Sequence, residues 1–340
     1  MAYTTINKSS DYFNTKLYTG NASTQAITGV GFQPDWLWIK NRSTTNNHNL
    51  FDAVRGANKK LASNTTGAEA TATNLTSFDS DGFTLASNGG TNGSGNNLVS
   101  WNWKANGQGS ANSDGSINTT YTSANTTSGF SINLFTATGS AGTIGHGLNA
   151  VPKMILVKDT NGTGSWQVYH ASLGATKYLA LNENIAAGTA SNRWNDTTPT
   201  SSVFSIGSEW SSGKTLIAYT FAEKKGFSKF SSFVGNGSTD GVFCYTGFRP
   251  AFVVVKKSSE ATGQWRMMDS KRSTSNVVNK SVYANLSNAE SSDTMLDFTA
   301  QGFKMRSTDQ DVNKSGVTYI YMAFAEEPLV SSNGVPAVAR

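Results

Sequence analysis

The chain carries Gly31-Phe-Gln-Pro-Asp-Trp-Leu-Trp-Ile-Lys40, and related stretches return as Gly147-Leu-Asn-Ala-Val-Pro-Lys-Met-Ile-Leu-Val-Lys158 and Gly247-Phe-Arg-Pro-Ala-Phe-Val-Val-Val-Lys256. In each copy a lysine follows six residues after a proline, and the residues between them are mostly large and apolar. Such a run predicts a strand buried on both faces. Because proline cannot donate a ladder hydrogen bond, we expect it at the first position of the strand. We expect the lysine where the strand returns to water.

Other strand-like segments flank each copy in the same order. One lies upstream, and an alternating segment closes each copy at 99–105, 217–223 and 320–326. Alternation of large with small or polar residues is typical of a strand with one buried face. No long segment has apolar residues at helical spacing. We therefore predict an all-β protein of three tandem antiparallel β-sandwich repeats with a jelly-roll-like form and little helix.

The repeats set the expected boundaries. The first repeat takes residues 1–105, with its strands from residue 12, and the second and third take 129–225 and 226–328. Residues 106–128 are rich in Gly, Ser and Asn and predict an exposed linker, about which the first repeat can pivot. The second and third repeats adjoin directly, so we expect them to pack in a fixed relation. Residues 329–340 lie outside the repeat and predict an extended tail that docks on a partner.

Composition excludes several classes of protein. Only 14% of the 340 residues are charged, and the net charge of +5 comes from scattered basic residues. A nucleic-acid-binding protein would cluster its basic residues on one face or element, so we expect no nucleic-acid partner. No apolar run approaches the roughly 18 residues of a membrane helix, and the amino terminus has no signal-peptide pattern. We expect no membrane insertion and synthesis in the cytoplasm without a leader.

Residues that commonly carry chemistry are few. The three histidines, His48, His146 and His170, occupy unmatched places in the repeat and have no metal-ligand spacing. Cys244 lies in an apolar string and predicts a small buried side chain. No Gly-x-Ser-x-Gly string occurs. We expect no catalytic residue, no cofactor and no metal site.

Acidic residues need a separate interpretation. Asp52 and Asp269 recur at equivalent places, and recurrence in a repeat indicates an architectural role, because an active site needs to exist only once. The strings at 79–82 and 309–313 place oxygen side chains at alternate positions. Such oxygens are either calcium ligands or ordinary Asp and Asn turns.

Tryptophan supplies the candidate binding residues. Most of the eight tryptophans fall on expected strands, where core packing explains them. Trp194 and Trp210 lie instead in turn-rich segments. An exposed tryptophan stacks on a sugar ring or on a partner protein, so we predict a surface binding role for these two residues.

Several strings together resemble a known family. They are the Gly-Phe-x-Pro strands, Phe78-Asp-Ser-Asp-Gly-Phe83, Tyr319-Ile-Tyr-Met-Ala-Phe-Ala-Glu-Glu-Pro328, the opening Met1-Ala-Tyr-Thr-Thr-Ile6 and the closing Val335-Pro-Ala-Val-Ala-Arg340. The chain resembles a domain family of tailed bacteriophages, common in marine phages, that is described as structural or tail-fibre-like and of unknown function. The resemblance covers almost the full chain and implies a virion component. It supplies no catalytic residues.

Three functions follow as hypotheses from different classes. The first is a non-enzymatic virion structural protein, a tail fibre or surface appendage that attaches the virion to its host. The alternative is a capsid decoration protein that stabilises the head, and the third is a glycan-active enzyme, whose paired carboxylates need not be close in sequence. The expected partners are other virion proteins, further copies of the chain, and a host-surface glycan or receptor.

Overall fold

The computed structural model describes residues 4–328, which form strands and connecting turns with very little helix. The helical elements among these residues are the turn η1 (Ser9–Asp11) and the helices α1 (Gly89–Asn92) and α2 (Ser191–Trp194). The all-β prediction is therefore confirmed. The expected extended tail, residues 329–340, lies outside the described residues.

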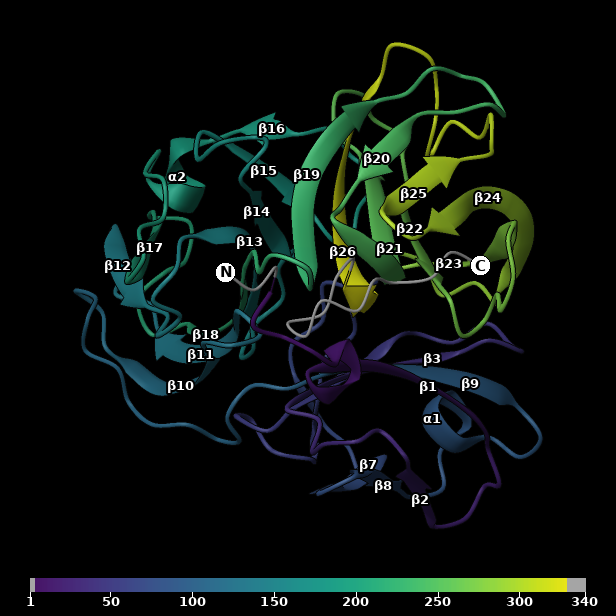
Figure 1. Cartoon of the computed structure of the whole chain (residues 1–340). Coiled ribbons are helices and arrows are strands. Elements are labelled where there is room, and N and C mark those ends of the chain that lie inside the picture. Colours follow the sequence, from purple (N-terminus) through teal and green to yellow (C-terminus); the bar gives the residue numbers. More distant parts are fainter. Residues whose placement is uncertain (1–3, 329–340) are drawn as a thin grey trace.

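Three large antiparallel sheets surround the middle of the molecule (Figure 1). In spatial order the first contains β1 (Phe13–Thr19), β9 (Asn97–Trp103), β3 (Trp36–Asn41) and β4 (Asn49–Asp52). The second contains β10 (Thr119–Asn125), β11 (Phe130–Thr136), β18 (Thr215–Ala222), β13 (Pro152–Asp159), β14 (Gln167–His170), β15 (Lys177–Ala180) and β16 (Gly188–Thr189). The third contains β19 (Ser228–Val234), β26 (Thr318–Pro328), β21 (Phe248–Lys257), β22 (Trp265–Asp269), β23 (Val278–Tyr283), β24 (Ser291–Thr299), β25 (Gly302–Met305) and β20 (Phe243–Tyr245).

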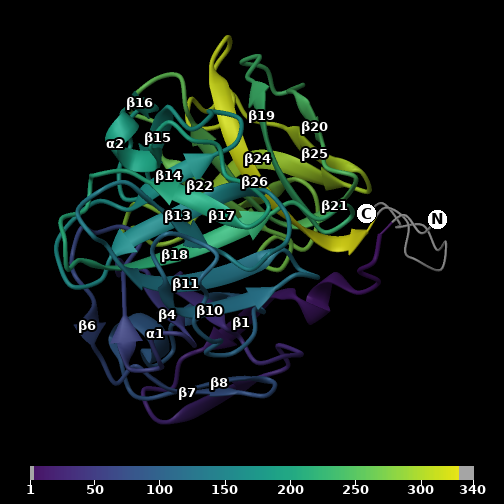
Figure 2. The ribbon, with the colours of Figure 1, turned by 90° about the vertical axis from the view of Figure 1, so that its left-hand side faces the viewer.

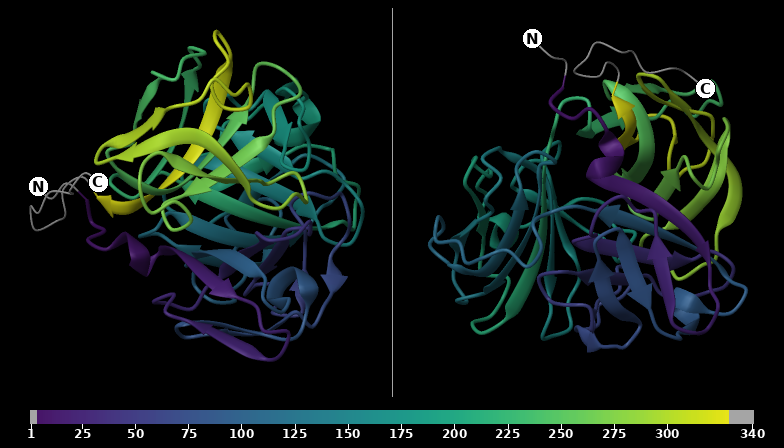
Figure 3. Two further views of the ribbon diagram at one scale, coloured as in Figure 1. Left: turned by 90° about the vertical axis from the view of Figure 1, so that its right-hand side faces the viewer. Right: turned by 60° about the horizontal axis from the view of Figure 1, so that its bottom comes forward.

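The same strand order runs through the three sheets. The order β1-β9-β3-β4 corresponds to β11-β18-β13-β14 and to β19-β26-β21-β22. We name the three parts of the molecule unit 1 (residues 4–105), unit 2 (106–225) and unit 3 (226–328). Figure 3 shows the units arranged around a common centre. Close superposition of the units and their jelly-roll-like form stay predictions.

Shorter strands cover the outer faces of the large sheets. Unit 1 has β2 (Gln25–Thr28), β8 (Gly82–Leu85) and β7 (Leu75–Asp79) in one sheet and β5 (Lys59–Lys60) with β6 (Ala70–Thr71) in another; unit 2 has β12 (Gly142–Gly145) with β17 (Val203–Ile206). In unit 3 the corresponding strands β20, β25 and β24 continue from the large sheet (Figure 2). Each unit encloses its own apolar cluster, so the β-sandwich-like character is supported.

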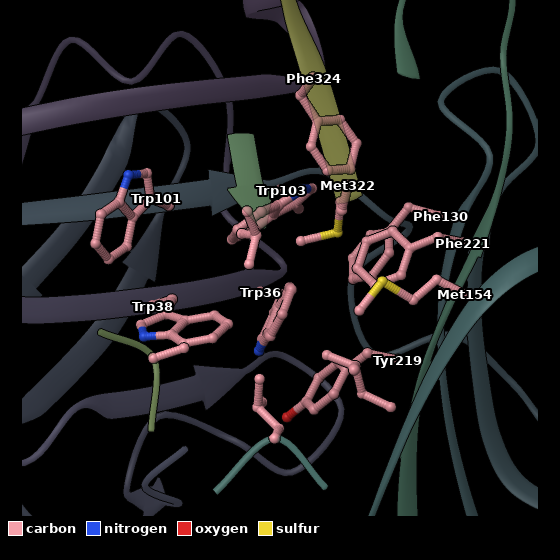
Figure 4. Packing of buried hydrophobic residues seen from close by; sticks show 14 of the residues in the cluster. Trp36, Trp38, Trp101, Trp103, Phe130, Met154, Tyr219, Phe221, Met322 and Phe324 are labelled. Carbon is pink, nitrogen blue, oxygen red and sulfur yellow. The ribbon is translucent and has the colours of Figure 1, made fainter. Parts of the chain in front are cut away.

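The inner faces of the three large sheets meet in one shared core. Trp36 of unit 1 stacks on Tyr219 of unit 2, with ring centroids 4.4 Å apart (Figure 4). Phe13 of unit 1 stacks on Phe324 of unit 3, with ring centroids 5.0 Å apart. All six residues of β3 are buried, because Trp36 and Trp38 face the shared core while Leu37 and Ile39 face the cluster of unit 1. Strands buried on both faces are what the repeated stretch predicted.

The prolines of the repeated stretch do not all begin their strands. Pro152 is the first residue of β13, as expected, but Pro34 precedes β3 by two residues and Pro250 is the third residue of β21. The ladder has register shifts at Pro152 and Pro250. An irregular ladder accommodates a residue that cannot donate a main-chain hydrogen bond.

The three lysines do not return to water, and this expectation was wrong. Lys40, Lys158 and Lys256 are 0% exposed. Lys40 donates to the carbonyl of Ser287 in unit 3 at 3.2 Å, and Lys256 donates to that of Ile185 in unit 2 at 2.7 Å. Burial lowers the pKa of Lys40 and Lys158 to about 8 and that of Lys256 to about 7. Each strand therefore ends against protein, not solvent.

Residues 106–128 are not an exposed linker. They contain β10, which pairs with β11, and the buried Ile117, which forms a parallel bridge with Ile144 of β12. Asn125 of β10 also donates to the carbonyl of Ala105 in unit 1 at 3.2 Å. The polar composition misled the prediction, because an edge strand keeps one row of polar side chains toward water. The shared core and these bonds also remove the expected freedom of unit 1 to pivot.

Candidate functional site

Hydrogen bonds from side-chain rings connect the three units in a cycle, from unit 1 to unit 3, from unit 2 to unit 1 and from unit 3 to unit 2. In each unit the residue at or just before the start of β4, β14 or β22 directs its side-chain ring at a main-chain carbonyl of a neighbouring unit. The pairs are His48 Nε2 with Tyr283 O (2.8 Å), Trp166 Nε1 with Ala62 O (2.9 Å) and Trp265 Nε1 with Ala180 O (3.0 Å). Because Trp38 donates its indole N–H to Nδ1 of His48, Nε2 of His48 carries the proton in its bond to Tyr283. These bonds fix the units relative to one another.

The recurring aspartates lie at the same interfaces. Asp52 of unit 1 is fully buried and accepts hydrogen bonds from Tyr219 of unit 2 at 2.7 Å and from the guanidinium of Arg55 at 2.6 Å. Asp269 of unit 3 accepts from the indole of Trp101 in unit 1 at 3.0 Å and pairs with Arg272. Buried carboxylates persist when they are paired and hydrogen-bonded. The architectural role that we inferred for the two aspartates agrees with these contacts.

Unit 2 meets unit 3 without these charges. His170 stands where the other units have Asp52 and Asp269, and Leu173 replaces the arginine three residues later. The residue of unit 3 that corresponds to Tyr219 and Trp101 is Met322 of β26, which cannot donate a hydrogen bond. Nε2 of His170 instead lies 3.3 Å from the carbonyl of Tyr321. At the interface between units 2 and 3, the aspartate and the side chain that would donate to it are therefore both replaced.

The remaining histidine and the cysteine belong to the interior. His146 is 0% exposed and its Nε2 lies 3.2 Å from the carbonyl of Thr200, while burial lowers its pKa. Burial raises the pKa of the Cys244 thiol to about 12, so the reactive thiolate is scarce at neutral pH. Within residues 4–328, no three His, Cys, Asp or Glu side chains gather as metal ligands do.

Trp194 and Trp210 are not surface residues, and this prediction was wrong. They are 1% and 7% exposed and belong to the apolar cluster of unit 2. Trp194 meets Tyr169 of β14 edge to face, with ring centroids 5.9 Å apart. The turn-rich sequence around Trp194 folds inward through the short helix α2, which local composition could not reveal.

The aspartates of the two calcium-like strings accept hydrogen bonds from other groups of the protein. Asp81 accepts the main-chain N–H groups of Gly29 and Gly31 at 2.9 and 2.6 Å, and these bonds lower its pKa. Asp309 accepts from the guanidinium of Arg266 at 2.9 Å. The turn interpretation of both strings is therefore the one that their contacts favour.

The exposed aromatic side chains that the sequence reasoning missed lie on β20. Phe243 is 47% exposed and Tyr245 is 54% exposed, whereas Cys244 between them points into the cluster of unit 3. The register of β20 with β25 places Phe243 opposite Lys304. The signal in the sequence is the alternation across Cys244, whereas apolar composition alone predicts that the whole string is buried.

The strands that correspond to β20 carry no aromatic residues. Ile27 of β2 and Ile144 of β12 pair with phenylalanines of β8 and β17 just as Cys244 pairs with Phe303 of β25. The residues that flank them are small or polar; they are Ala26, Thr28, Thr143 and Gly145. In unit 2 the edge of β12 is also covered by Ile117. We name Phe243 and Tyr245 of the edge strand β20 the β20 edge, and it is our candidate binding site.

The fold and the site define an all-β protein whose three sheets share one aromatic core. The chain belongs to the family described as a domain of unknown function, DUF7483, whose model matches residues 8–328. No curated protein matches the chain, and no solved structure matches it. Across residues 4–328, no helix has the length and apolarity needed to cross a membrane.

Proposed function

We propose that this chain is a non-enzymatic virion structural protein of a tailed bacteriophage, a tail-fibre or surface appendage that attaches the particle to its host. The observation that carries the binding role is the β20 edge, with Phe243 and Tyr245 about half exposed on the last strand of a sheet. Exposed aromatic side chains on a terminal strand offer a partner both apolar area and main-chain hydrogen bonds. The carbonyl of Tyr245 already accepts from the hydroxyl of Tyr321 at 3.4 Å, so the main-chain groups of Phe243 carry the pairing.

The virion assignment is supported by the resemblance of the strings at 78–83 and 319–328 to the bacteriophage family. The contacts of the ionisable groups agree with a structural protein. Asp52, Asp269, His48 and His170 bond to groups of neighbouring units, so these side chains are already used in holding the units together. A fold dominated by one shared core suits a rigid building block that presents a fixed surface.

The test combines localisation with adsorption. Cryo-electron microscopy of particles with a labelled chain should place it on the tail, and particles carrying Phe243→Ser with Tyr245→Ser should adsorb to host cells roughly 10-fold more slowly or worse, as expected for two aromatic anchors. The matched control is Val151→Ser, which removes an apolar side chain of 39% exposure from unit 2. Equal adsorption by wild type and the double variant would refute the binding role of β20.

Two outcomes would replace the proposal with its alternatives. Density for the chain on the head, with normal adsorption, would favour the capsid decoration protein. Release of sugars from host polysaccharide by the purified protein, abolished by substitution of one carboxylate, would favour the glycan-active enzyme.

A further inference from the structure

A groove runs along the outer edge of β1, between unit 1 and unit 3. Asn14, Thr15 and Lys271 line both of its parts, which measure about 330 and 140 Å³. The smaller part extends to Ala325 and Glu326 near the end of β26, and Figure 1 shows β1 below that end of the strand. Residues of β1 in unit 1 therefore form one side of the groove, and residues of unit 3 form the other side.

Strand β1 has a neighbour on one side only. It pairs with β9, and the main-chain bond from Lys104 to Tyr12 fixes which residues face that neighbour. Since bonded and unbonded positions alternate in an antiparallel pair, the N–H and C=O groups of Phe13, Thr15 and Leu17 point away from β9. No described residue forms a main-chain hydrogen bond with these groups.

Unit 2 has a strand where unit 1 has the groove. Strand β10 pairs antiparallel with β11, the counterpart of β1, and occupies the edge that β1 leaves open. Strand β10 also contacts the segment after β9, through the bond from Asn125 to Ala105. The corresponding segment of unit 3 is the end of β26, which lines the groove. In unit 1 an extended strand therefore fits between β1 and the end of β26, which correspond to the two neighbours of β10.

Two features of the groove indicate the chemistry of its occupant. Thr15 lines both parts of the groove and is 6% exposed, and its buried hydroxyl has no hydrogen-bond partner. Lys16 and Lys271 also line the groove, and neither forms an ion pair with another described residue, although Lys16 lies near enough to Asp81 to help lower the pKa of that carboxyl. Glu326, the acid at the far end, already lies 3.2 Å from Arg249. The groove therefore presents positive charge that carboxylates would complement.

We propose that the β1 groove binds an extended acidic peptide segment of a partner protein, which pairs antiparallel with β1 as β10 pairs with β11. The main-chain groups of Phe13, Thr15 and Leu17 bond to the peptide backbone. Lys16 and Lys271 bind its carboxylates, and the hydroxyl of Thr15 gains a partner. This site is separate from the β20 edge, and its test does not depend on the proposed function.

The test uses the full chain and a labelled extended peptide of alternating Thr and Val with two Asp residues. Fluorescence anisotropy should show saturable binding, and Lys16→Gln with Lys271→Gln should weaken it roughly 2- to 30-fold, as expected for two solvent-exposed ion pairs. The matched control, Lys60→Gln with Lys177→Gln, removes two lysines outside the groove and should leave the affinity unchanged. A peptide with Lys in place of Asp should bind more weakly.

Hydrogen exchange separates strand pairing from simple charge attraction. The amides of Phe13, Thr15 and Leu17 should exchange more slowly when the acidic peptide is bound. Three outcomes would overturn the proposal. The first is that the peptide does not bind at millimolar concentration, and the second is that a sulfated glycan binds through the two lysines without slowing exchange of these amides. The third is that exchange of these amides slows in the free chain as protein concentration rises, which would make a second copy of the chain the occupant.

Discussion

Removal of the Asp52 carboxylate tests the interface between units 1 and 2. In the Asp52→Ala variant, Tyr219 loses its acceptor, and Arg55, whose side chain is 2% exposed, keeps only Glu69 at 3.0 Å as its ion-pair partner. Because a buried charge without its partner is costly, we expect the free energy of unfolding to fall by about 3–5 kcal/mol. Tyr219→Phe removes the hydrogen bond donated to Asp52 and the one accepted from Nη2 of Arg55 at 3.3 Å, and it should cost about 1–2 kcal/mol. Urea unfolding at pH 7 measures both variants.

The chain itself supplies the matched control. The combined variant Asp52→His, Arg55→Leu, Glu69→Ala and Tyr219→Met copies the side chains that unit 2 and unit 3 use at their own interface. Ala187 is the counterpart of Glu69, because its N–H bonds to Ser258 as that of Glu69 bonds to Thr160. Since replacing a whole buried ion pair is cheaper than breaking it, this variant should lose less stability than Asp52→Ala alone. A loss under about 1 kcal/mol for Asp52→Ala, or a larger loss for the combined variant, would contradict the pairing argument.

Three further predictions concern pH and the tail. Burial lowers the pKa of His48 from 6.5 to about 3 and that of His170 to about 4, so both residues bind fewer protons in the folded than in the unfolded protein. The free energy of unfolding should therefore fall as the pH drops from 6.5 to about 3. At about 1.4 kcal/mol per pKa unit, His48→Gln should reduce this fall by about 4–5 kcal/mol, as measured by urea unfolding at each pH. The same argument for Lys256, whose pKa is lowered from 10.5 to about 7, predicts stability that rises between pH 7 and 9 and a flatter profile in Lys256→Met. Deletion of residues 329–340 should leave the circular dichroism spectrum unchanged but impair incorporation into particles, and normal incorporation would remove the docking role of the tail.

The repeated stretch predicted the strands well because its signal is local. A run of large residues between Pro34 and Lys40 has few alternatives to a strand buried on both faces. The same sequence could not show what lies beyond the strand. Lys40 is buried because Ser287, distant in sequence, offers its carbonyl. Single-sequence patterns report periodicity, whereas the cost of burying a lysine is offset by partners that only the folded chain brings close.

The errors at Trp194, Trp210 and 106–128 share one cause. Polar, turn-rich composition predicts exposure, yet short segments of this kind cover apolar clusters when they lie over a sheet edge or fold inward. The prediction for the β20 edge was wrong in the opposite sense, because apolar composition predicts burial where the side chains are exposed. The apolar string around Cys244 includes Phe243, yet of the residues of β20 only Cys244 faces the interior. Which side of an edge strand faces water depends on the neighbouring sheet, and composition does not encode this.

The comparison of the units indicates where the binding surfaces lie. The inner faces of all three large sheets are used in the shared core, so differences between the units can affect partners only at the edges and outer faces. Unit 2 closes both of its corresponding edges with its own chain, since β10 covers β11 and Ile117 covers β12. Unit 1 leaves the corresponding edges of β1 and β2 without a paired strand, and unit 3 leaves those of β19 and β20 without one. An open strand edge carries a risk of unwanted pairing, and small proteins usually cover or charge it. The lysines beside β1 and the aromatic residues on β20 are therefore best explained as parts of two binding edges, while unit 2 serves as the closed structural link between them.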